Sequence, residues 1–156
     1  MELTSLTFRF EQPFRVPAQS AFDWCTDFRE ADAAKFPYPL RRTLRWLTKD
    51  ALLMTDISFP NGKRRRVQRL VRINRAERSW TNTHVAGPFL HSQYWYSIVP
   101  DGPRRSHLEF RGMRIIRTPT KLSSRSVERM SREERKDDAT LWRKYLAPAL
   151  EQDLAV

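Results

Sequence analysis

Three polar side chains stand at alternating positions in segments that are otherwise rich in apolar residues, and these could do chemistry inside the protein. Arg69 shares its parity with Val67 and Val71, so a strand through these residues would point all three toward one face. A buried guanidinium needs a partner, and an anion bound in a cavity would be one. The simpler interpretation is that a bulge or the end of the strand lets Arg69 reach water. Both interpretations stay open at this point.

The other two polar side chains are His84 and Tyr94. His84 shares a face with Trp80 and could serve as a hydrogen-bonding group or a general acid or base, although an ordinary structural hydrogen bond is the simpler expectation. Tyr94 and Tyr96 share a face, and we expect that face to point inward. Tyrosine there offers apolar area together with a hydroxyl group that can orient a ligand.

Other kinds of site find no support in the sequence. His84, His91 and His107 are scattered over three expected strands, and no Cys or His pair has metal-ligand spacing. Four glycines form no phosphate-binding loop. The acidic pairs Glu133-Glu134 and Asp137-Asp138 are interpreted as solvated charge on a helix surface rather than catalytic carboxylates. We therefore expect no catalytic residue, metal site or cofactor.

The composition indicates one globular domain over residues 1–156, with 40% hydrophobic and 30% charged residues. No segment is long and apolar enough to span a bilayer, and residues 1–4 do not have the character of a signal peptide. The single cysteine, Cys25, cannot form an intrachain disulfide and is expected to be a small buried hydrophobe rather than a nucleophile. A cytoplasmic location is the expectation.

The chain carries 29 basic and 18 acidic residues, a formal charge of +11. Such a surface attracts anions, including nucleic acid and acidic lipid headgroups. The run Lys63-Arg64-Arg65-Arg66 follows an Asn61-Gly62 hairpin signal, but no nucleic-acid-binding motif accompanies it. We interpret the run as a charged strand end that protects against aggregation. We expect no specific nucleic-acid partner and only weak association with anionic membrane surfaces.

The order of the expected elements is strand, two short helices, six strands and one long helix. A first strand covers residues 3–16, Pro17 opens a helix that continues to Phe28, and a second short helix covers residues 30–35. Six strands joined by short turns then indicate an antiparallel meander. These strands are expected near residues 44–46, 52–59, 63–73, 80–85, 89–99 and 106–116.

The C-terminal part is expected to be a mobile loop over residues 118–130, followed by the long helix. Ser131 and Glu134 have the spacing of a capping box, and Pro148 should kink the helix or end its regular part. A strongly curved sheet can bury the apolar face of such a helix by wrapping around it. The fold class is therefore α+β, with a curved seven-stranded antiparallel sheet around a long C-terminal helix.

This arrangement resembles the START/Bet-v-1-like superfamily, or SRPBCC, whose fold is called the helix-grip. The stretch from Phe14-Arg15-Val16-Pro17-Ala18 to Asp27-Phe28 is similar to the family's entry into its first helix, and Asp101-Gly102 with residues 106–110 is similar to its last hairpin. The resemblance implies a cavity for an apolar ligand. Members carry or sense lipids, sterols, quinones, plant hormones and polyketides, and some are aromatase/cyclases.

We therefore expect a protein that binds or carries an apolar small molecule such as a lipid, quinone or polyketide, with or without an anionic group. The alternatives are a polyketide cyclase-like enzyme and a basic nucleic-acid-associated protein. The cavity is expected between the sheet and the C-terminal helix, although the same rings could instead fill a solid core. The candidate ligand-binding residues are Trp46, Arg69, Trp80, His84, Tyr94, Tyr96, Phe110, Trp142, Tyr145 and Leu146.

Overall fold

One antiparallel sheet carries the whole architecture, and its strands lie in the order β1-β7-β6-β5-β4-β3-β2. A computed structural model describes residues 1–155 of the chain. The strands are β1 (Glu2–Phe14), β2 (Leu40–Thr48), β3 (Ala51–Ser58), β4 (Arg65–Asn74), β5 (Ser79–Ala86), β6 (Gln93–Pro100) and β7 (Ser106–Thr118). Strands β2 to β7 follow one another as the predicted antiparallel meander. The first strand, β1, pairs with β7.

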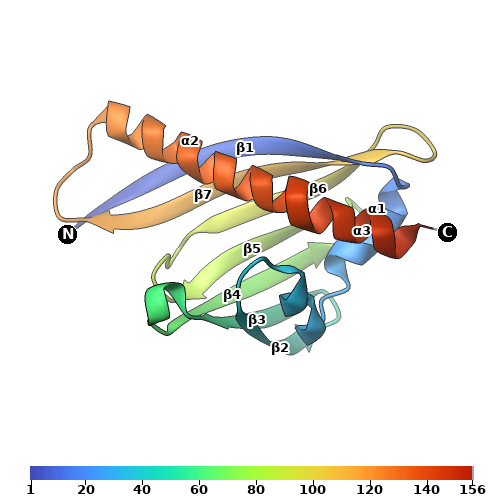
Figure 1. The fold of residues 1–156 in the computed structure, drawn as a ribbon, viewed down its shortest axis with the longest axis horizontal. Coiled ribbons are helices and arrows are strands. Elements are labelled where there is room, and N and C mark those ends of the chain that lie inside the picture. Colours follow the sequence, from blue (N-terminus) through green and yellow to red (C-terminus); the bar gives the residue numbers. More distant parts are fainter. Residues whose placement is uncertain (156) are drawn as a thin grey trace.

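The helices are grouped on one face of this sheet (Figure 1). They are α1 (Ala18–Thr26), the 3-10 helix η1 (Glu30–Lys35), and a long C-terminal rod made of α2 (Ser124–Leu141), η3 (Trp142–Leu146) and α3 (Ala147–Leu154). A further short 3-10 turn, η2 (Pro60–Gly62), forms the tip of the β3–β4 hairpin. Within residues 1–155, no helix is both long enough and apolar enough to cross a membrane.

The predicted start of the long helix is wrong, because the helix begins at Ser124 rather than at Ser131. The hydroxyl of Ser123 accepts a hydrogen bond from the backbone N–H of Ser126 at 3.1 Å, so Ser123 is the N-cap. Ser131 lies inside the helix. The polar composition of residues 118–130 suggested a loop, but from Ser124 onward it belongs to a helix whose first turns are largely exposed.

Pro148 interrupts the regular helix without ending it. The backbone N–H of Ala147 bonds to the carbonyl oxygen of Trp142, five residues earlier, so Trp142–Leu146 forms a π turn. Proline provides no N–H for an α-helical bond, and its ring would clash with the carbonyl four residues before it. The wider turn accommodates this, and the helix continues to Leu154.

Two local predictions about turns have different outcomes. Asn61 and Gly62 both have positive φ, at 54° and 76°, as predicted from the hairpin signal. The predicted sixth strand is too long, because β6 begins at Gln93 rather than Phe89. Residues 87–92 form a loop instead, in which Gly87 and His91 have φ of 110° and 74°. A strand cannot pass through such backbone angles.

The core lies between the sheet and the helices. Alternate residues are buried along much of β1, β3 and β7, and Leu52, Val71 and Leu108 are completely enclosed. Leu150 of α3 and Phe22 of α1 complete the core at the end of the sheet where the chain turns into its first helix. This packing fixes the C-terminal helix across the sheet and positions everything described below.

Candidate functional site

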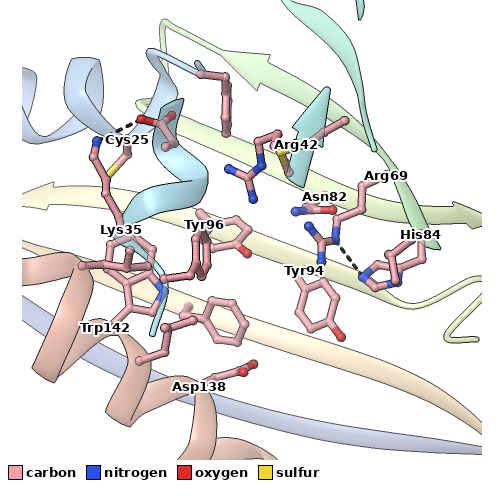
Figure 2. A pocket seen from close by; sticks show the side chains of 18 of the residues that line it. Cys25, Lys35, Arg42, Arg69, Asn82, His84, Tyr94, Tyr96, Asp138 and Trp142 are labelled. Carbon is pink, nitrogen blue, oxygen red and sulfur yellow. Dashed lines mark hydrogen bonds and ion pairs between the residues drawn. The ribbon is translucent and has the colours of Figure 1, made fainter. Parts of the chain in front are cut away.

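A cavity of about 490 Å³ lies between the C-terminal helix and the face of the sheet that carries it (Figure 2). Strands β2 to β7 supply one side of its wall, and α1, η1, α2, η3 and residues of the adjoining loops supply the rest. Some of its side chains are apolar rings and others are charged. The apolar part of the wall includes Phe28, Trp80, Tyr96, Phe110, Trp142 and Leu146. The polar part includes Arg42, Arg65, Arg69, Asn82, His84, Tyr94, Arg114 and Asp138.

The aromatic part of the wall is tightly organised. Trp80 and Tyr96 are directly opposite each other on β5 and β6, and their rings stack with centroids 4.8 Å apart at an interplanar angle of 4°. Phe110 meets Tyr96 edge to face at 5.1 Å. Such packed rings hold a flat apolar surface in place, against which another ring system can lie.

The polar part is built around one carboxylate, Asp56 on β3. Arg42 makes two hydrogen bonds to it, from Nε to Oδ1 at 2.8 Å and from Nη2 to Oδ2 at 2.9 Å. Arg69 adds a third bond, from Nη1 to Oδ2 at 2.7 Å. Burial alone would raise the pKa of Asp56, but these bonds and charges hold it below its usual range. Two guanidinium groups therefore share one carboxylate, and the cluster keeps a net positive charge beside the cavity.

His84 is buried next to this cluster. Its Nε2 accepts a hydrogen bond from Nε of Arg69 at 3.3 Å, which assigns the ring proton to Nδ1. Burial, together with the charges of Arg69 and Arg114, lowers the pKa of His84 to about 3. The imidazole is thus neutral near physiological pH. Its Nδ1 and Oδ1 of Asn82 have no hydrogen-bond partner among residues 1–155.

Arg114 and Tyr94 form a second polar group on the same side. Nε of Arg114 donates to the hydroxyl of Tyr94 at 2.9 Å, and Nη1 pairs with Glu134 of α2. Burial raises the pKa of Tyr94, so the phenol is protonated. The phenolic oxygen accepts the hydrogen bond from Arg114, so the hydroxyl hydrogen of Tyr94 remains free to donate another hydrogen bond. Tyr94 can therefore offer a hydrogen bond to a molecule in the cavity.

The helix side contributes three carboxylates to the cavity wall, Glu134, Asp137 and Asp138. For Asp138 the sequence predicted a solvated charge, and this prediction is wrong. Asp138 is half-buried in the cavity wall and has no ion pair with any residue in 1–155. Burial and the neighbouring carboxylates of Glu134 and Asp137, opposed by the charge of Arg114, raise its pKa to about 6. Figure 2 shows it on the helix, facing the residues of the sheet.

Eight of the ten predicted ligand-binding residues lie together in this cavity wall: Arg69, Trp80, His84, Tyr94, Tyr96, Phe110, Trp142 and Leu146. Trp46 and Tyr145 lie outside it, with exposures of 45% and 42%. Trp46 has the inward parity, but it lies near the end of an edge strand where the pairing with β3 shifts. Tyr145 lies in the π turn, which changes the angular spacing of residues along the helix and leaves this side chain exposed.

Several residues of the wall were missed by sequence reasoning, and three of them, Glu134, Asp138 and Arg114, could have been found. Glu134 and Asp138 are spaced by four residues from each other and from the predicted Trp142, which places all three on one helical face. Arg114 has the parity of Phe110 on β7. Arg42 and Asp56 could not be linked in this way, because their contact depends on the register between two strands.

Cys25 also lies in the cavity wall, on the side of α1. Burial raises the pKa of its thiol, although the charge of Lys35 lowers it. The thiol therefore stays protonated, which agrees with the predicted small hydrophobe. Outside the cavity, Glu11, His107 and Glu109 bring ligand atoms within 4.8 Å of one another. Both ring nitrogens of His107 already have carboxylate partners, Asp101 and Glu109, so this surface cluster is satisfied as ion pairs.

Comparison with known proteins gives no match to a family model and none to a curated protein sequence. Solved structures do match. The Zhui aromatase/cyclase from Streptomyces has a TM-score of 0.69 at 12% identity, covering 97% of this chain and 93% of its own. A START superfamily protein from Mycobacterium smegmatis has a TM-score of 0.68 at 18% identity, covering 94% and 98%. A norcoclaurine synthase point mutant from Thalictrum flavum has a TM-score of 0.71 at 7% identity, covering 98% of both chains.

Proposed function

We propose that this chain, which has the START/Bet v 1-like helix-grip fold, binds a small, largely apolar molecule that carries an anionic or strongly electronegative group. The observation that carries this proposal is the division of the cavity wall. Stacked rings line one part, and Arg42 and Arg69, two cations that share the single carboxylate of Asp56, line another. A buried excess of positive charge is costly unless a ligand or solvent compensates it.

The polar groups further restrict the ligand. Tyr94 donates a hydrogen bond, whereas Asp138 accepts one when ionised, so a hydroxyl-bearing ligand would have partners on both the sheet and the helix. Flat rings fit the face formed by Trp80 and Tyr96. Among the expected classes, an oxygen-rich aromatic molecule such as a quinone or a polyketide suits this wall better than a saturated fatty acid.

The test is native mass spectrometry of the purified chain, followed by extraction of the material that copurifies. The expected result is one small molecule per chain, with rings and at least one acidic oxygen. An Arg69→Gln variant should lose that molecule, while Arg104→Gln on the surface should keep it. A purified chain that carries no small molecule and gains none from a panel of quinones and aromatic polyketides would refute the proposal.

A second function is supported by one observation, the position of Asp138. A half-buried carboxylate whose pKa lies near 6 can exchange a proton with a ligand at physiological pH, as a general base or acid does. A polyketide cyclase-like enzyme would need such a group. In the Streptomyces neighbour the name records an aromatase/cyclase; for this chain the activity is a proposal.

The two functions differ in what Asp138→Asn should do. If the chain is an enzyme, the variant should bind the copurified molecule and fail to convert it, because the side chain keeps its shape and loses its proton exchange. If the chain is a carrier, wild type and variant should both return the molecule unchanged. His84→Gln and Tyr94→Phe, tested separately, show whether turnover also depends on the neighbouring hydrogen-bonding groups.

A further inference from the structure

The hairpin between β3 and β4 combines exposed cations with an exposed ring. We define the basic hairpin as residues 59–66. Phe59 is 56% exposed at its tip, and the side chains of Lys63, Arg64, Arg65 and Arg66 are all exposed. From residue 57 to residue 76 the chain contains no Asp or Glu. No neighbouring acidic residue in the sequence therefore offsets the charge of this hairpin.

Contacts across the strands do not offset it either. None of the four cations forms an ion pair with a carboxylate in residues 1–155. Arg66 is opposite Ile57, and Ile57 is opposite Arg41, so one row across the sheet adds a fifth exposed cation beside the hairpin. The molecule thus has a corner with a strong positive potential.

This corner adjoins the cavity. Arg65 belongs to the cavity wall, and its guanidinium lies 5.8 Å from the centroid of the Phe89 ring. The same ring lies 4.8 Å from the guanidinium of Arg114 inside the cavity. Gly87 holds the Phe89 loop against the hairpin, because a Cβ at that position would come within 2.7 Å of the carbonyl oxygen of Arg66. Figure 1 shows this loop, between β5 and β6, beside the short turn η2.

We propose that the basic hairpin docks the protein onto a bilayer that contains anionic lipids, with the cations on the headgroups and Phe59 in the interfacial layer. Exposed aromatic residues flanked by Lys and Arg are typical of surfaces that lie in a membrane interface. Tyr38, which is 48% exposed and also lines the cavity, would face the same layer. Docking here would bring the rim of the cavity to the lipid surface.

Nucleic acid is the less suitable partner for this corner. Single strands are bound by basic grooves in which successive bases stack on aromatic rings. The basic hairpin instead projects a single exposed ring, Phe59, beside its cations. The proposal goes beyond ligand binding, because a vesicle can be bound whether or not the cavity is filled. Failure of one proposal therefore leaves the other intact.

The experiment is co-sedimentation with vesicles of phosphatidylcholine alone and of equimolar phosphatidylserine and phosphatidylcholine, at about 0.1 M salt. The wild type should bind only the anionic vesicles. Arg64→Gln/Arg66→Gln should weaken this binding by about thirtyfold, since each cation near such a surface contributes about fivefold. Phe59→Ser should weaken it by about tenfold or more, because the buried ring is lost.

The matched control is Arg104→Gln/Arg105→Gln. It removes the same charge from the exposed β6–β7 turn, which lies at the other end of the sheet (Figure 1). This control should bind anionic vesicles as the wild type does. Equal losses in both double variants, or no binding to anionic vesicles, would overturn the proposal. Tighter binding to a single-stranded oligonucleotide, unaffected by Phe59→Ser, would overturn it in favour of nucleic acid.

Discussion

Arg69 and Asp56 lie diagonally across neighbouring strands, with Nη1 of the arginine 2.7 Å from Oδ2 of the carboxylate. Arg42 approaches the same carboxylate from the other neighbouring strand. Asp56 thus joins β2, β3 and β4 from inside and leaves one positive charge in excess. This arrangement has consequences for both stability and ligand binding.

Asp56→Asn should destabilise the fold by about 3 kcal/mol, because Arg42 would remain buried without a counter-charge. The measurement is the free energy of unfolding in urea. Asp50→Asn is the control, since Asp50 pairs with Arg75 at the surface, where the two side chains are 38% and 50% exposed. That pair should contribute about 0.5 kcal/mol. Similar losses of stability in both variants would show that the loss in Asp56→Asn does not come from a buried, uncompensated Arg42.

Asp138→Asn should stabilise the folded chain at neutral pH by about 1–2 kcal/mol, after allowance for partial exposure. The folded pKa, raised to about 6, means that the protonated carboxyl is favoured in the fold. This contribution is fully present below about pH 4, the pKa range of an unfolded Asp, and is lost as the pH rises through the folded pKa. Wild type and variant should therefore converge in acid.

The measurement is a set of urea unfolding curves at acidic and neutral pH. Asp137→Asn, the adjacent exposed carboxylate, should change stability by well under about 1 kcal/mol at either pH. If the Asp138→Asn variant were only as stable as the wild type at neutral pH, this would show that Asp138 does not lie in a desolvated site.

Trp142→Ala should cost less than the roughly 3–5 kcal/mol expected for a tryptophan in a solid core, because Trp142 borders the cavity on one side. Phe22→Ala is the comparison, since Phe22 is only 1% exposed and lies outside the cavity wall, and it should incur the full cost. Chemical denaturation measures both. A larger loss for Trp142→Ala than for Phe22→Ala would indicate a packed core in place of a binding wall.

Ser123→Ala should lower the stability of the fold by about 1 kcal/mol, because the backbone N–H of Ser126, in the first turn of the helix, loses its acceptor. Ser131→Ala should change stability little, since Ser131 lies within the helix and alanine is a good helix former. Thermal unfolding followed by circular dichroism distinguishes the two variants. The reverse ranking would place the start of the helix at Ser131.

The sequence predicted the parts of the structure that depend on local periodicity. The strands alternate every two residues, so Trp80, Tyr96 and Phe110 could be assigned to one inner face before their contacts were known. The antiparallel meander followed from the short turns between strands. The helix-grip fold predicted from this order is confirmed by the architecture and by the solved structures that it matches.

The remaining parts depend on register or on where a helix begins. The contact between Arg69 and Asp56 requires the register of β3 and β4, which no local pattern encodes. Asp138 was misplaced because its charge indicated a solvated helix surface, although its spacing of four residues from Trp142 puts both on one helical face. The cap at Ser123 lacks the glutamate three residues later that would have marked it in the sequence.

The most direct test of the cavity as an anion-accepting apolar site is a titration of the wild type and Arg69→Gln with 2-naphthoate and its neutral amide, followed by tryptophan fluorescence. Trp24, Trp80 and Trp142 line the cavity and should report binding. The wild type should bind the carboxylate saturably and prefer it to the amide by about tenfold, and Arg69→Gln should lose that preference. Equal affinity for both compounds in the wild type, or no fluorescence change with either, would contradict the account.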